Sequence, residues 1–174
     1  MSRARILIVD DELILRESLL GWLERDDHLP DAVASGEEAL DQIKQKRYDI
    51  VFLDIKLEGM DGLEVLKRIR EIDPDVSVVM ITAYGSISSA VEAMKNGAQD
   101  YLLKPFEPEA LSLLIDKILE SKAQAKENIY LRERHKERTR FESLLGQSRA
   151  MQEIFDFIQD VAPTESTVLI TGET

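Results

Sequence analysis

The sequence contains no cysteine and only two histidines in 174 residues. The absence of cysteine excludes disulfides, thiolate nucleophiles and zinc–thiolate sites, and nothing indicates an oxidising compartment. Two histidines are too few for a His-rich metal centre. No apolar run is long enough to span a bilayer, and Met1 to Arg5 lead straight into a short apolar run without a signal-peptide pattern. We therefore expect a cytoplasmic protein without membrane contact.

Basic side chains are also scarce, with 22 Lys and Arg against 34 Asp and Glu and a formal net charge of −12. This charge argues against sequence-independent binding to nucleic acid or to an anionic membrane. The acidic surplus lies almost wholly in residues 1–120, whereas residues 121–174 are nearly neutral. The chain therefore divides into one compact domain and a differently built appendage.

Short apolar runs alternate with helical patterns through residues 1–120. The capping box of Ser35 and Glu38 marks the start of one of these helices. Parallel strands joined by helices form an open sheet that is covered on both faces, so the pattern predicts an α/β, doubly wound, flavodoxin-like fold with strand order 2-1-3-4-5. The five predicted strands are residues 6–9, 29–34, 49–54, 76–81 and 99–103.

Charged and polar residues follow the predicted strands at one rim of this sheet. Asp10 and Asp11 follow the first strand, Asp54 ends the third, Thr82 follows the fourth and Lys104 follows the fifth. In the predicted order, the first and third strands are neighbours at the point where ligands bind in such sheets. Three neighbouring carboxylates need a cation to stay ionised, and their oxygen ligands favour Mg²⁺.

The same rim resembles a phosphoryl-transfer apparatus. An Asp54 carboxylate acting as nucleophile would form an acyl phosphate, with Lys104 and the metal spreading the charge. Thr82 could donate its hydroxyl to a phosphoryl oxygen, and the ring of Tyr101 could swing in or out. Singly, these residues also fit a helix cap, a loop hydroxyl, a strand aromatic and a strand end. Their joint position on one rim favours function.

Residues 4–120 contain five short motifs at specific spacings. The motifs are Ile-Val-Asp-Asp-Glu at 8–12, Ile-Val-Phe-Leu before Asp54, Met60-Asp61-Gly62, Thr82-Ala83, and Tyr101 ahead of Lys104-Pro105. With this set, residues 4–120 resemble the receiver domain of two-component response regulators. The resemblance implies that Asp54 accepts a phosphoryl group from a sensor histidine kinase, that Lys104 contacts this group, and that Thr82 and Tyr101 form a switch. It also implies a cis bond between Lys104 and Pro105. The Mg²⁺ ligands that it implies are Asp10, Asp11, Asp54 and the backbone carbonyl of Lys56.

A long helical pattern begins near Glu107 and continues into a linker over residues 121–143. Its apolar positions are close to heptad spacing, but Lys122 lies in the seam. The pattern fits either a core helix with a solvated extension or a helix that pairs two chains. We favour the second, which predicts a homodimer. The apolar positions of this seam are Leu111, Ile115, Ile118, Ala125 and Ile129.

A helix is expected from Ser148, and a strand at 167–171 leads into Gly172, the first residue of a phosphate-loop pattern whose Lys is not present. With Leu145-Gly146-Gln147-Ser148 and the helix that follows, residues 144–174 resemble the start of the AAA+ ATPase domain of sigma-54-dependent, NtrC-like activators. We expect a fragment cut inside that domain, which binds neither ATP nor promoter DNA. In the parent protein, the resemblance implies contact with its own AAA+ domain and with sigma-54 RNA polymerase.

Two alternatives to a phosphorylation-controlled switch stay open at this point. A Mg²⁺-dependent phosphatase with an aspartyl nucleophile has a similar sheet, but it usually needs a second Asp two residues after the nucleophile, where this chain has Lys56. A receiver that only binds partners without phosphorylation is the other. Apart from its own phosphoryl transfer and hydrolysis, we expect no enzymatic activity.

Overall fold

The computed structural model describes residues 3–83, 87–138, 148–164 and 167–169. The chain forms two compact units, Met1–Gln124 and Ala125–Thr174. The first unit contains a sheet in which all neighbouring strands are parallel, in the order β2-β1-β3-β4-β5, as the sequence predicted. Its strands are β1 (Arg5–Val9), β2 (Leu29–Val33), β3 (Ile50–Asp54), β4 (Ser77–Thr82) and β5 (Asp100–Leu103).

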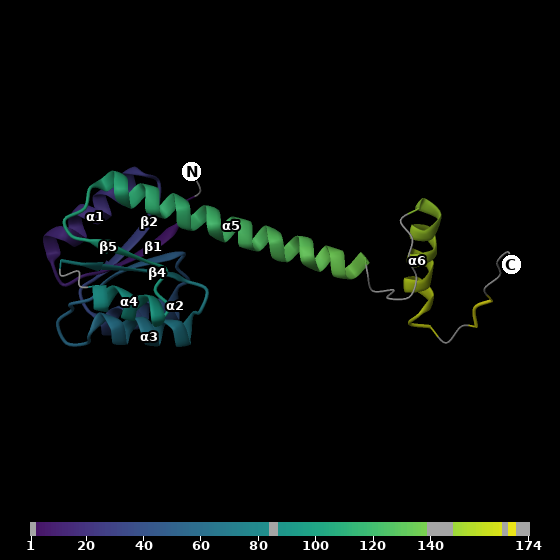
Figure 1. Cartoon of the computed structure of the whole chain (residues 1–174), viewed down its shortest axis with the longest axis horizontal. Coiled ribbons are helices and arrows are strands. Elements are labelled where there is room, and N and C mark those ends of the chain that lie inside the picture. The colour runs from purple at the N-terminus through teal and green to yellow at the C-terminus, as the bar shows by residue number, and fades with distance from the viewer. Residues whose placement is uncertain (1–2, 84–86, 139–147, 165–166, 170–174) are drawn as a thin grey trace. The chain divides into compact units, whose positions relative to one another are not determined.

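Helices cover both faces of this sheet. Helices α1 and α5 lie on one face, and α2, α3 and α4 lie on the other (Figure 1). The described helices are α1 (Leu13–Arg25), α2 (Gly36–Gln45), α3 (Gly62–Ile72), α4 (Ile87–Lys95), α5 (Pro108–Arg138) and α6 (Arg149–Val161).

Two apolar layers hold the sheet between its helices. Alternate residues of a strand point to opposite faces, so Ile6 and Ile8 pack toward α1 and α5, while Leu7 and Val9 pack toward α2 and α3. All five residues of β3 are buried, as expected for a central strand covered on both sides. This packing fixes the position of Asp54, the last residue of that strand.

Side-chain caps mark where two of the helices begin. The hydroxyl of Ser35 accepts a hydrogen bond from the Glu38 amide at 3.3 Å, which confirms the predicted start of α2. The Glu38 carboxylate, however, accepts from the amide of Ala34 at 3.1 Å rather than from Ser35. Asp61 caps α3 by accepting from the Leu63 amide at 2.8 Å.

The first half of the predicted heptad seam serves the core of the first unit. Leu111, Ile115 and Ile118 on α5 are almost completely buried against the sheet and α1. These three residues therefore do not form a surface for a second chain, because the sheet already covers them. The same spacing of apolar residues serves a helix that packs on its own domain and a helix that packs on a partner.

In the second unit, α6 begins where the sequence predicted. Ser148 caps it by accepting from the Met151 amide at 3.3 Å. The strand predicted at 167–171 is absent from residues 167–169, and the remainder of that strand, like Gly172, lies outside the described residues. A lone strand has no neighbour for its backbone hydrogen bonds, so this piece of sequence does not form one by itself.

None of the helices in the described ranges has the length and hydropathy needed to cross a bilayer.

Candidate functional site

Three predicted carboxylates meet where β1 and β3 end. Val9 is paired with Leu53 across the two strands, so Asp10 directly follows β1 beside Asp54 at the end of β3. Asp10, Asp11 and Asp54 each present a carboxylate oxygen, and these oxygens lie within 4.8 Å of one another. Asp10 and Asp54 are buried, whereas Asp11 is exposed. The arrangement is the acidic cluster that the strand order predicted.

Lys104 supplies the cation of this cluster. Its Nζ lies 2.6 Å from Oδ2 of Asp10 and 2.5 Å from Oδ2 of Asp54. The Lys104 amide donates to the carbonyl of Thr82 at 2.8 Å, which places the loop after β5 beside the end of β4. The Lys104–Pro105 peptide bond is cis, as predicted. One ammonium group thus bridges two carboxylates from different strands.

Backbone amides hold the other oxygens of the two buried carboxylates. The Glu12 amide donates to Oδ1 of Asp10 at 2.9 Å, and the Lys56 amide donates to Oδ1 of Asp54 at 3.0 Å. The N-cap residue of α1 is Glu12, which makes no side-chain cap, so Asp10 does not serve as the helix cap itself. Each buried carboxylate is therefore oriented on one side by backbone and on the other by Lys104.

Burial and the charges in the cluster raise the pKa values of Asp10 and Lys104, each for a different reason. Burial raises the pKa of Asp10, and the hydrogen bond and charge of Lys104 offset only part of this effect. Burial alone would lower the pKa of Lys104, but its hydrogen bonds to Asp10 and Asp54 and their negative charges raise it overall. Lys104 therefore stays an ammonium ion at neutral pH.

The donor set of the cluster fits a hard divalent cation. When ionised, three carboxylates against one ammonium leave an excess of two negative charges, and every acidic ligand atom is an oxygen. Mg²⁺ is commonly held by one or two carboxylates while it keeps several waters. Exposed Asp11 lies on the solvent side of the cluster, where an ion can approach.

The two predicted switch residues lie on the neighbouring strands. Thr82 ends β4 and is almost fully buried, and Tyr101 on β5 is paired with Met80. The Tyr101 ring packs against the apolar layer beneath α2, α3 and α4. Its hydroxyl oxygen is buried and has no hydrogen-bond partner among the described residues. Of the two positions that the sequence left open for this ring, the structure shows the inward one.

Two further residues support the cluster that sequence reasoning did not assign to it. A Cβ added to Gly62 would lie only 2.1 Å from the carbonyl oxygen of Asp54, so α3 can begin against this backbone only with glycine. The Arg16 guanidinium donates to the backbone carbonyl of Asp10 at 2.6 Å. Gly62 belongs to the Met60-Asp61-Gly62 motif, which is a signal for its position, whereas nothing in the local sequence distinguishes Arg16 from other helix arginines.

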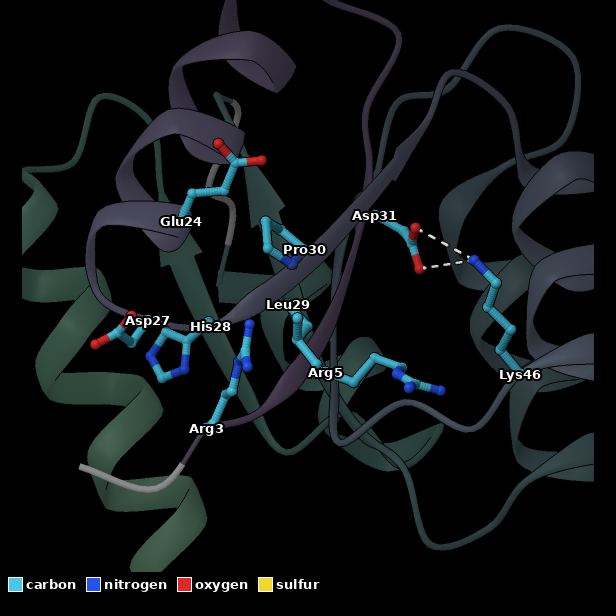
Figure 2. Close-up of a pocket in the computed structure, with 9 residues that line it drawn as sticks. All are labelled: Arg3, Arg5, Glu24, Asp27, His28, Leu29, Pro30, Asp31 and Lys46. Carbon is cyan, nitrogen blue, oxygen red and sulfur yellow. Dashed lines mark hydrogen bonds and ion pairs between the residues drawn. The ribbon is translucent and has the colours of Figure 1, made fainter.

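A cavity of about 570 Å³ lies at the opposite end of the strands (Figure 2). It includes no residue of the acidic cluster. Within it, the Lys46 ammonium contacts the Asp31 carboxylate at 3.1 Å, as the dashed lines in Figure 2 show. Its basic and acidic side chains are equal in number, so it has no net charge that would select a phosphoryl group. Its lining residues are Arg3, Arg5, Glu24, Asp27, His28, Leu29, Pro30, Asp31 and Lys46.

The fold and the acidic cluster together define the class of protein to which the chain belongs. The chain is a flavodoxin-like, doubly wound sheet with an acidic site where its strand order reverses, between β1 and β3. A family model described as the response regulator receiver domain matches residues 6–116. The chain belongs to this family, and the resemblance drawn from its motifs is confirmed.

Curated relatives match nearly the whole chain. The transcriptional regulatory protein ZraR from Escherichia coli O157:H7 is 37% identical over 172 residues, which cover 97% of this chain and 37% of the relative. The nitrogen assimilation regulatory protein NtrX from Azorhizobium caulinodans is 37% identical over 169 residues, which cover 96% of this chain and 36% of the relative. The chain spans little more than a third of the length of these relatives.

Solved structures show the same likeness. A crystal structure of NtrX from Brucella abortus has a TM-score of 0.72 and 36% sequence identity, with 95% of this chain and 36% of that chain covered. A CheY-like receiver domain protein from Methanospirillum hungatei has a TM-score of 0.66 and 31% identity, with 71% of this chain and 99% of that chain covered. The second match spans a whole receiver domain and confirms the predicted fold class.

Proposed function

We propose that the chain accepts a phosphoryl group on Asp54 from a sensor histidine kinase and uses it to control an attached transcription activator. The observation that carries this proposal is the contact of one ammonium, that of Lys104, with both Asp10 and Asp54 inside the three-carboxylate cluster. This arrangement combines a carboxylate nucleophile with a cation beside it, as phosphoryl transfer requires.

In the proposed reaction, an Oδ atom of Asp54 attacks the phosphorus of a phosphohistidine. The new O–P bond gives an acyl phosphate, the P–N bond breaks, and the imidazole nitrogen takes a proton from solvent. The Lys104 ammonium moves from bridging two carboxylates to pairing with a phosphoryl oxygen. Mg²⁺, when bound, spreads the negative charge of the transferred group. The groups that would hold it are Asp10, Asp11, Asp54 and the backbone carbonyl of Lys56.

The acyl phosphate would then act on the neighbouring strands. Thr82 would donate its hydroxyl to a phosphoryl oxygen, and the Tyr101 ring, which already lies inward, would be held in that position. The movement of Thr82 would change the surface formed by α4, β5 and α5. This surface already presents apolar side chains to solvent, and such side chains are suited to a contact that depends on the switch. These exposed residues are Val91, Met94, Leu103 and Leu113.

The remainder of the chain would connect this switch to its output. Residues 1–120 would be the receiver, 121–143 a linker that pairs two chains, and 144–174 the start of an AAA+ ATPase domain. In the whole protein, that domain and sigma-54 RNA polymerase would be the targets, and ATP hydrolysis would belong to residues outside this chain. The transcriptional and nitrogen assimilation regulators among the relatives support this assignment, and we propose that the protein works in the cytoplasm.

A phosphatase that uses Asp54 as its nucleophile is less well supported. Such an enzyme needs an acid or base near the acyl phosphate to activate water. Two residues after Asp54 the chain has Lys56, whose amide orients the Asp54 carboxylate. This arrangement favours an acyl phosphate that persists as a signal.

The experiment is phosphorylation of the Asp54→Asn variant by acetyl phosphate in the presence of Mg²⁺. We expect acid-labile phosphate on the wild type and on Asp41→Asn, a control at an exposed carboxylate on α2, and none on Asp54→Asn. Circular dichroism would establish that all three proteins fold alike. Acid-labile phosphate on Asp54→Asn at the wild-type level would overturn the assignment.

A further inference from the structure

Lys122 continues the buried side of α5 beyond its last apolar core residue. The core residues Leu111, Ile115 and Ile118 follow one another at intervals of four and three positions, and the next position in this series is 122. Lys122 is half-buried, and residues 123–127 after it are all exposed. Among residues 119–127, Lys122 is therefore the last one that α5 packs against the first unit.

The Lys122 side chain ends on a backbone group of the sheet. Its Nζ lies 2.7 Å from the carbonyl oxygen of Asp49, directly before β3. The same oxygen accepts from the Ser77 amide at 3.1 Å, and the Asp49 carboxylate accepts from the Arg5 amide at 2.9 Å. Asp49 therefore connects β1, β3 and β4 at the amino-terminal ends of these strands, opposite the acidic cluster. The hydrogen bond from Lys122 connects α5 to the same residue.

We propose that Lys122 is a positioning residue that anchors the last turn of α5 within the first unit to the start of β3, the strand that ends in Asp54. A hydrogen bond from an ammonium to a backbone carbonyl is stronger than one between neutral groups. The anchor thereby determines where along α5 the helix stops packing against the receiver.

The anchor also explains a lysine at a heptad position. A lysine in the seam between two paired helices lowers the stability of the pair. Here the Lys122 ammonium binds the Asp49 carbonyl of the same chain, so this turn of α5 is not available to a second chain. Any pairing through α5 therefore begins after this turn. The contact itself does not depend on phosphorylation, although the consequence for pairing rests on the proposed function of the linker.

The test is nuclear magnetic resonance of the full chain with Lys122→Met. Methionine keeps an unbranched side chain and helix propensity but cannot donate. We expect an upfield shift of the Asp49 carbonyl carbon and about tenfold faster exchange of the amides of residues 121–124. Lys126→Met is the matched control, because Lys126 is an exposed lysine on the next turn of the same helix. It should leave both signals unchanged.

Two more variants distinguish loss of the Lys122 hydrogen bond from a general loosening of the helix and from an effect of phosphorylation. Lys122→Arg, which keeps a charged donor, should restore most of the protection of residues 121–124. Asp54→Asn should keep the Asp49 carbonyl shift of the wild type, so failure of the phosphoacceptor assignment would leave the anchor intact. The proposal is overturned if Lys122→Met leaves the Asp49 carbonyl and the amide exchange unchanged, or if Lys126→Met changes them equally.

Discussion

Lys104 and Asp54, 50 positions apart in the chain, are joined by a contact of 2.5 Å between Nζ and Oδ2. The same ammonium lies 2.6 Å from Asp10, so one cation offsets the charge of two buried carboxylates. The receiver therefore holds two strands of its acidic cluster together through the residue that would pair with the phosphoryl group. In the proposed function, the stability of the cluster and phosphoryl transfer would depend on the same side chain.

This dependence predicts how Lys104→Met behaves without and with Mg²⁺. Without the metal, the two buried carboxylates lose their cation, and the free energy of unfolding should fall by about 2–3 kcal/mol. Saturating Mg²⁺ should restore most of this loss, because the ion binds only the folded cluster. Urea unfolding at several Mg²⁺ concentrations measures both effects. The control is Lys44→Met, whose exposed ammonium pairs with Asp41 on α2. An identical Mg²⁺ dependence in the two variants would contradict the prediction.

Replacement by alanine should have opposite effects on the free energy of unfolding at Gly62 and at Gly21. At Gly62 a Cβ would lie 2.1 Å from the Asp54 carbonyl and 2.8 Å from the Cα of Ile55, so Gly62→Ala must displace the backbone of Asp54, the proposed phosphoacceptor. We expect a loss of about 2 kcal/mol in the free energy of unfolding. At Gly21, inside α1, a Cβ meets nothing within 4 Å, and Gly21→Ala should stabilise by about 0.5–1 kcal/mol. Urea unfolding of the two variants measures both signs, and equal tolerance of alanine at the two sites would refute the close approach.

The hydrogen-bonded carboxylate of Asp31 should make the wild type more stable than a variant without this charge, and the difference should disappear in acid. Its carboxylate accepts from the Tyr48 hydroxyl at 2.8 Å and from the Lys46 ammonium at 3.1 Å, and these hydrogen bonds outweigh its burial and lower its pKa. A lowered pKa contributes stability above the ordinary value of about 3.9, and this contribution is lost as the pH falls through the folded-state value. The site is partly exposed, so solvent screening keeps the effect below about 1 kcal/mol.

The variant for this site is Asp31→Asn, which can still accept from Tyr48 but carries no charge. We expect it to be less stable than the wild type near pH 7 and to approach the wild type as the pH falls from about 5 to below 3.9. Chemical unfolding at each pH measures the difference, with Asp41→Asn as the exposed control. A difference that stays constant over this range would show that the charge of Asp31 is not its cause.

The fold and the acidic cluster could be predicted because strand periodicity and strand order depend on local sequence and on general rules of chain crossing. Once β1 and β3 are neighbours, Asp10 and Asp54 must meet. The contacts that could not be predicted are those that depend on packing geometry. Lys122 was placed in a helix-pairing seam by its spacing, yet its ammonium reaches Asp49, 73 positions earlier in the chain. The donation from Arg16 to the Asp10 carbonyl likewise has no local signal.

The proposed pairing through the linker must use residues beyond the anchored turn of α5. Leu111, Ile115 and Ile118 are buried in the receiver itself, which leaves Ala125 and Ile129 as the apolar positions of the predicted seam. Replacing both with glutamine keeps helix propensity but removes the apolar seam. We expect the wild-type chain to sediment as a dimer and the double variant to dissociate at least tenfold more readily.

The matched control for this last experiment is Lys126→Gln, which introduces the same residue type on the same helix outside the seam. It should sediment like the wild type, because the predicted contact does not include position 126. Analytical ultracentrifugation over a range of protein concentrations, with and without beryllofluoride and Mg²⁺, separates constitutive pairing from pairing that follows phosphorylation. If the double variant and the wild type have the same sedimentation profile in both states, the linker does not pair chains. In that case the apolar surface of α4, β5 and α5 becomes the remaining candidate for self-association.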